Sequence, residues 1–69
     1  MSLSKGQHVD TMNAITIQAG GVHFVHIEPN TTGVVLEVEG RFPQRALVRF
    51  NVDGEIVEDW IDSDELLPH

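Results

Sequence analysis

The sequence predicts an all-β domain in which five strands form a small barrel, with one short helical turn near the carboxyl terminus. Three observations carry this prediction. Apolar and polar residues alternate with a period of two through much of the chain, strong turn signals separate the alternating runs, and no window holds apolar residues at helical spacing through more than about two turns. We expect a single domain over residues 7–69, preceded by a flexible segment, residues 1–6.

The first half of this domain predicts a short strand followed by a hairpin. Residues 8–12 fit the short strand, and residues 14–27 form two arms on either side of Gly20 and Gly21. Glycine tolerates the positive φ angles that a tight turn requires. Pro29 ends the second arm, because proline cannot donate to a strand ladder.

The second half predicts a meander of three strands, which we number third to fifth, counting the two arms of the hairpin as the first two and the short strand as additional to these five. Turns at residues 40–44 and at Asp53-Gly54 separate them. Period-two alternation gives each strand one core-facing side: Val34, Leu36 and Val38 in the third, Ala46, Val48 and Phe50 in the fourth, Val57 and Ile61 in the fifth. Ser63 is suited to cap a helical turn that carries acids at its positive end, and Leu66 then folds back on the core.

Composition limits the function classes. The chain has 69 residues, a net charge of -7 and no cysteine, so disulfides and thiolate metal sites are excluded. A small core of this size favours self-association. The charge would repel a phosphate backbone, which disfavours nucleic acid as a partner. The apolar runs are far short of the roughly 20 residues that span a bilayer. We expect a cytoplasmic protein with no membrane contact and no cofactor.

Several runs resemble the small SH3-like barrels of bacteria. These runs are Ile27 to Val38, Ala46 to Phe50, Trp60-Ile61 and Asp64-Glu65-Leu66, and the resemblance covers residues 27–68. It implies a five-stranded SH3-like barrel, a fold whose members are mostly binding or scaffolding parts.

The same fold includes the type II dihydrofolate reductases, which become active by tetramerising around a pore. Those enzymes carry a Val-Gln-Ile-Tyr run on their last strand, and the nearest run here is residues 57–60, Val-Glu-Asp-Trp. A pore lined by these acids would repel the phosphates of NADPH. The resemblance therefore does not lead us to expect reductase activity in this chain.

The last predicted strand carries the candidate partner-binding surface. Seven of the 11 acidic residues lie between Asp53 and Glu65, and a partly exposed tryptophan among them is typical of an interface anchor. A basic partner is the functional interpretation; the alternative is a solvated edge whose charges prevent aggregation. The candidate partner-binding residues are Trp60, Glu58, Asp59 and Asp62.

The predicted hairpin is the candidate self-association surface. Residues 22–27 are apolar on both faces of a strand, and a two-sided apolar strand requires cover on both sides. Either the barrel covers both faces or a second copy of the chain covers one. The candidate self-association residues are Ile15, Ile17, Phe24, Val25 and Ile27.

No catalytic or metal site is predicted. His23 and His26 are three positions apart, which places their side chains on opposite faces of a strand. The sequence therefore favours a non-enzymatic protein-interaction module or accessory subunit that forms a homo-oligomer. The alternative is an oligomeric enzyme of the reductase type, with a site at a symmetry axis.

Overall fold

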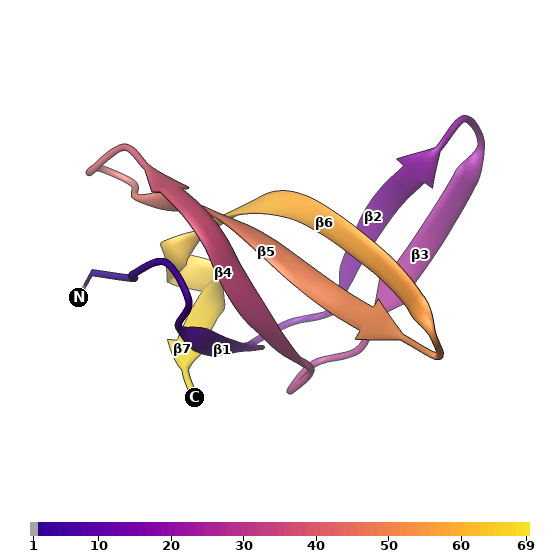
Figure 1. Cartoon of the computed structure of the whole chain (residues 1–69), viewed down its shortest axis with the longest axis horizontal. Helices are drawn as coiled ribbons and strands as arrows, with labels where there is room; N and C mark the ends of the chain where they lie inside the picture. Colours follow the sequence, from indigo (N-terminus) through magenta and orange to yellow (C-terminus); the bar gives the residue numbers. More distant parts are fainter. Residues whose placement is uncertain (1) are drawn as a thin grey trace.

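The computed structural model describes residues 2–69, which form seven strands and one 3-10 turn (Figure 1). The predicted all-β class is confirmed, although the structure has two strands more than the five expected. The strands are β1 (His8–Thr11), β2 (Ile15–Gly20), β3 (His23–Ile27), β4 (Thr32–Glu39), β5 (Arg45–Val52), β6 (Glu55–Asp62) and β7 (Leu66–Pro68). The turn η1 (Ser63–Glu65) lies between β6 and β7.

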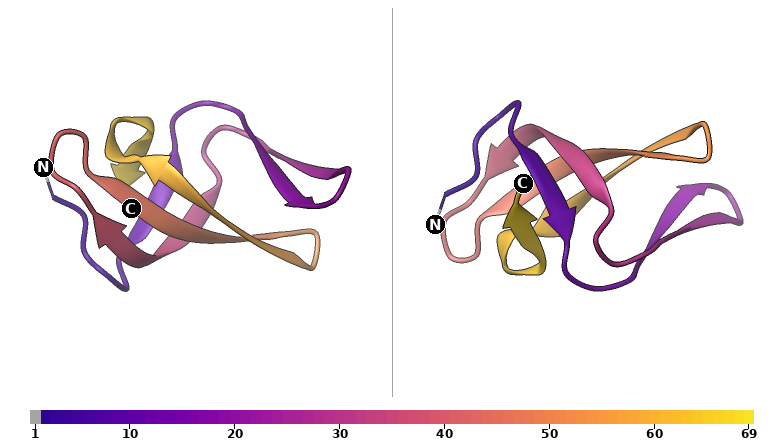
Figure 2. Two further views of the ribbon diagram at one scale, coloured as in Figure 1. Left: turned by 90° about the horizontal axis from the view of Figure 1, so that it is seen from above. Right: turned by 90° about the horizontal axis from the view of Figure 1, so that it is seen from below.

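The strands form two antiparallel sheets. One has five strands in the order β6-β5-β4-β1-β7, and the other is the hairpin of β2 and β3. No hydrogen-bonded ladder joins the two sheets within the described residues, but β2 packs against β6. The hairpin and the turn between β5 and β6 extend toward the same end of the molecule, and both termini lie toward the other end (Figures 1 and 2).

The core lies between the five-stranded sheet and the inner face of the hairpin. The expected inward faces of β5 and β6 are confirmed: Phe50 is 0% exposed and Ile61 is 4% exposed. The two-residue turn between these strands has positive φ at Asp53 (53°) and Gly54 (89°), as a tight hairpin turn requires. The buried apolar side chains are Leu3, Val9, Ile17, Val25, Ile27, Val35, Ala46, Val48, Phe50, Val57, Ile61 and Leu66.

The expected inward face of β4 is wrong. Val35, predicted to face outward, is 1% exposed, whereas Val38 is 38% exposed. Val35 lies on the same side as Gly33, and a glycine there lets β4 approach β5 closely, because an added Cβ would lie 2.6 Å from Val48. A register shift between Val35 and Glu37 then interrupts the alternation, as a β-bulge does.

The amino-terminal segment is anchored over its described part, residues 2–6, rather than extending away from the domain. Leu3 is 5% exposed, and its backbone N–H donates to the Gln44 side chain at 2.8 Å. The backbone N–H of Gly6 donates to the carbonyl of Val35 at 2.7 Å. Leu3 therefore extends the core, although nothing in its local sequence predicts a strand or helix.

The predicted helical turn is present, but its capping differs from the expectation. Asp62 is the N-cap residue and makes no side-chain capping bond; the Ser63 backbone N–H instead donates to the Gln44 carbonyl at 2.8 Å. Leu66 is buried as expected. It begins β7, which pairs with β1 and which the sequence did not predict. A three-residue strand that ends in Pro68 has too short a pattern to be recognised.

Candidate interaction surface

The outer face of β5 and β6 presents four pairs of directly opposed residues. Leu47 faces Trp60 near the middle, with charged pairs on both sides. Because residues alternate along a strand, the alternation that buries Ala46 and Val48 turns Leu47 and the other residues of this face outward. We call this surface the Trp60 face, and its cross-strand pairs are Arg45 with Asp62, Leu47 with Trp60, Arg49 with Glu58, and Asn51 with Ile56.

Ion pairs surround the apolar pair of the Trp60 face. Arg49 lies 3.0 Å from Glu58, while Arg45 lies 3.2 Å from Glu39 and 3.7 Å from Asp62. Arg49 therefore points outward from the sheet. All of these side chains are at least 39% exposed, so each pair contributes up to about 1 kcal/mol of stability. They place one arginine on each side of the Leu47–Trp60 pair.

Trp60 is half-buried, and one side of its ring is occupied by its own chain. The Arg45 guanidinium lies 5.7 Å from the ring centroid, a cation–π distance. The Glu39 and Asp62 carboxylates lie within ion-pair distance of the same guanidinium. A large aromatic side chain that packs on one side against its own chain and is partly exposed on the other is suited to be an interface anchor.

The structure brings together three of the four candidate partner-binding residues. Trp60, Glu58 and Asp62 share the Trp60 face, whereas Asp59 faces the buried Val48 across the ladder. The Asp59 carboxylate accepts a hydrogen bond from the backbone N–H of Trp60 at 2.8 Å. Sequence reasoning missed Leu47 and Arg45 as members of the surface, because only the strand register shows which β5 residues face Trp60.

The Trp60 face and the charged residues beside it, on β4 and at Lys5, are nearly balanced in charge. Four carboxylates there, Glu37, Glu39, Glu58 and Asp62, lie within 4.0 Å of one of three cations, Lys5, Arg45 or Arg49. Elsewhere in the described part, four acidic residues take part in no ion pair: Asp53, Asp59, Asp64 and Glu65. The excess negative charge therefore lies mainly beside the Trp60 face rather than on it.

Most of the candidate self-association residues pack into or against the core of their own chain. Ile17, Val25 and Ile27 are at most 6% exposed and belong to the core, and Ile15 packs against it half-buried. Phe24 lies on the opposite face of the hairpin and is 59% exposed. The inner face of the hairpin is thus covered by the five-stranded sheet, and the outer face is open in the single chain.

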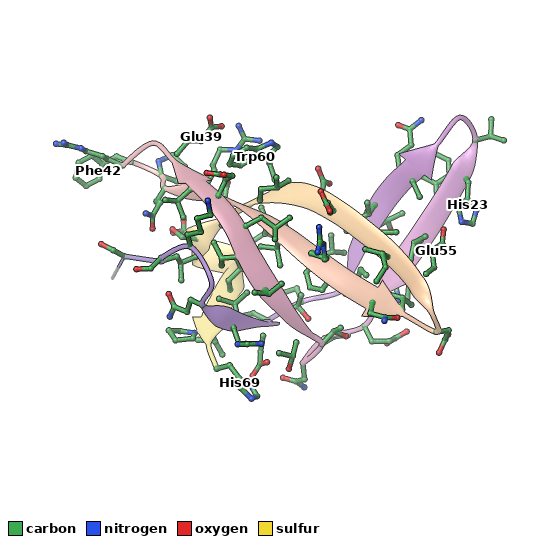
Figure 3. All side chains as sticks on the ribbon, viewed as in Figure 1. His23, Glu39, Phe42, Glu55, Trp60 and His69 are labelled. Carbon is green, nitrogen blue, oxygen red and sulfur yellow. The ribbon has the colours of Figure 1, made fainter. Side chains whose placement is uncertain are left out.

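Three of the four histidines lie within ion-pair distance of a carboxylate, and His8 does not within the part of the chain that the structure describes. His23 lies 2.8 Å from Glu55, which ties the hairpin to the start of β6 (Figure 3), and His26 lies 3.0 Å from Glu28. Among residues 2–69, no three side chains of His, Asp or Glu converge in a way that would hold a metal ion. No helix in the described part is long and apolar enough to cross a bilayer.

Asp10 is the titratable group with a clear perturbation. The Thr32 hydroxyl donates to Asp10 Oδ1 at 2.6 Å, and His69 Nδ1 lies 3.0 Å from the same oxygen. Both interactions favour the carboxylate, so they hold the pKa of Asp10 below its ordinary value. These groups join β1 to β4 and to the carboxyl-terminal residue, which makes them structural contacts of the sheet.

The loop between β4 and β5 carries a second exposed aromatic residue. Phe42 is 98% exposed and projects at the tip of the loop, far from the hairpin (Figure 3). A hollow of about 470 Å³ beside it is lined by Ser2, Gly40, Arg41, Phe42 and Gln44.

Comparison of the chain with protein-family models, with characterised proteins and with solved structures gives no match.

Proposed function

We propose that this chain is a non-enzymatic protein-interaction module or accessory subunit, folded as an SH3-like barrel, that self-associates and binds a basic partner at the Trp60 face. The observation that carries the proposal is the Leu47–Trp60 pair, which lies half-buried on the outer face of the sheet with ion pairs on both sides. An apolar centre with a charged rim is the usual organisation of a protein interface. The acidic residues beside this face favour a partner of positive charge.

The barrel interpretation is supported by how the core is enclosed. The meander of β4, β5 and β6 covers one side, and the inner face of the hairpin packs against β6 and covers another. Leu66, at the start of β7, and Leu3, in the amino-terminal segment, are buried in the same core. A small domain that wraps its strands around one core in this way leaves its outer faces free for contacts.

A titration with a basic peptide tests the binding part of the proposal. Trp60 is the only tryptophan of the chain, so its fluorescence reports on this face. We expect a saturable change in Trp60 emission with a peptide rich in lysine and arginine, and none with an acidic peptide of the same length. Added salt should weaken the binding.

Two matched leucine substitutions locate the binding. Leu47→Ser removes the apolar neighbour of Trp60, whereas Leu67→Ser changes an exposed leucine on β7, at the other edge of the sheet. We expect Leu47→Ser to weaken peptide binding by about tenfold, the effect of roughly 1.4 kcal/mol, and Leu67→Ser to leave it unchanged. Equal affinities of the wild type and both variants, or equal responses to the basic and acidic peptides, would contradict the proposal.

A further inference from the structure

The four strand edges of the two sheets differ in how they are protected. An exposed edge invites pairing with another chain, and proteins block it with charge, proline, irregularity or cover. The β6 edge carries four acidic residues, and β7 has only three residues and ends in Pro68. The β2 strand has a register irregularity between Gln18 and Gly20 and packs against β6. The β3 strand, His-Phe-Val-His-Ile, has none of these protections.

Charge makes the hairpin the most favourable place for two copies to meet. Each chain carries a net charge of -7, yet no Asp, Glu, Lys or Arg occurs from Thr11 to Ile27. Two copies that approach through β3 therefore avoid placing carboxylates directly against carboxylates. His23 and His26 lie 2.8 Å from Glu55 and 3.0 Å from Glu28 of the same chain.

A projecting side chain and a hollow lie at opposite ends of β3. Val22, just before the strand, is 93% exposed. A hollow of about 350 Å³ lies at the other end, between the exit of the hairpin and the turn that joins β5 to β6. The hairpin and the turn between β5 and β6 extend toward the same end of the molecule (Figure 2). The lining residues of the hollow include His26, Ile27, Glu28, Thr31, Asn51 and Val52.

We propose that two copies of the chain pair antiparallel along β3, about a two-fold axis at Val25, and that Val22 of each copy enters the hollow of the other. This register pairs all five residues of β3. It sets Phe24 opposite the partner's His26, and Val22 opposite the partner's Glu28, at the mouth of the hollow. The resulting sheet has four strands, in the order β2-β3-β3-β2. The inference rests on the self-association proposed above and specifies its surface.

Sedimentation velocity over a range of protein concentrations tests the pairing. We expect the wild type to form a dimer, and Val22→Lys to raise its dissociation constant by at least about tenfold, since a buried valine would be replaced by a charged side chain. Thr16→Lys is the matched control. Thr16 is exposed on the same hairpin but on β2, one strand away from the proposed contact, so this variant should dimerise as the wild type does. Circular dichroism checks that both variants are folded.

Cysteine substitutions test the register, and the chain contains no cysteine that would interfere. Directly opposed residues of an antiparallel pair have Cβ atoms about 4.5–5.5 Å apart, close to the range that a disulfide bridges. A mixture of the Phe24→Cys and His26→Cys variants should therefore form a covalent dimer under mild oxidation, faster than either variant alone. Faster cross-linking of Phe24→Cys by itself would overturn the proposed register.

The outcomes separate this inference from the proposed function. A dimer that resists Val22→Lys would overturn the β3 pairing but leave self-association in place. A chain that is monomeric at every concentration would overturn both, while the Trp60 face is still tested by the basic peptide. If the backbone amides of β3 are protected from hydrogen exchange only when a different protein is present, pairing between copies would also be overturned.

Discussion

Gly33 lies where β4 passes closest to the core side chains of β5, and alanine at this position is expected to destabilise the fold. An added Cβ would lie 2.6 Å from Val48 Cγ1, 2.8 Å from Phe50 Cε1 and 2.9 Å from the Arg49 carbonyl oxygen. Val48 and Phe50 are 0% exposed, so neither has space into which to move. The carbonyl belongs to the strand paired with β4, so it can move only if the ladder is distorted.

The magnitude follows from two opposing effects. Overpacking of a core typically costs about 1–3 kcal/mol, while the reduced freedom of the unfolded chain on replacing glycine by alanine offsets about 0.4–1 kcal/mol. We expect Gly33→Ala to lower the free energy of unfolding by about 1–2 kcal/mol. For a domain of this size, that loss lowers the melting temperature by about 5–15 °C.

Urea unfolding followed by Trp60 fluorescence measures this change, with the slope against urea expected to stay constant. Val48→Ala supplies an internal control, because it removes the nearest of the three clashing atoms. Gly33→Ala should cost less in that background than in the wild type, since contacting residues couple by about 0.5–3 kcal/mol. A variant as stable as the wild type, or equal costs in the two backgrounds, would refute the close-packing explanation.

Three further predictions concern the core, the Trp60 face and the corner of the sheet around Asp10. Phe50→Ala should cost about 3–5 kcal/mol, comparable to the whole stability of about 3–10 kcal/mol expected at this length, so circular dichroism should show a largely unfolded chain at 37 °C. Arg45→Gln should change Trp60 emission by removing the guanidinium at 5.7 Å while lowering stability by less than about 1 kcal/mol; an unchanged spectrum would argue against the contact. Because the pKa of Asp10 is lowered in the folded state from its ordinary value of 3.8, its contribution to stability is present above that ordinary value and is lost as pH falls through the lower folded value. Asp10→Asn should therefore show a smaller loss of stability between pH 5 and pH 2 than the wild type, and equal acid sensitivity of the two proteins in urea unfolding would contradict this.

Local pattern was sufficient to predict elements in which only one face is apolar or the turn residues are distinctive. In β5, apolar and polar residues alternate almost without exception, so its inward face follows from the period of two. The Asp53-Gly54 turn was predictable because few residues tolerate its positive φ angles. The hairpin was predictable in the same way from Gly20 and Gly21.

The pattern was insufficient where both faces of a strand are apolar. Val34, Val35 and Leu36 are consecutive, so alternation gives no preference between the two faces. The choice depends on Gly33, whose missing side chain matters only once Phe50 lies against it. The buried position of Leu3 likewise depends on Gln44, which is distant in sequence.

The sequence by itself determined the all-β class, the positions of the tight turns and the absence of charged side chains between Asp10 and Glu28. These properties follow from short-range sterics and from composition, which do not depend on the rest of the fold. The tertiary structure alone decided that Leu47 faces Trp60, that the arginines of β5 pair with acidic residues of β4 and β6, and that a hollow lies beside the end of β3. Strand register and packing set these contacts, because they join residues whose separation along the chain carries no information about their distance in space.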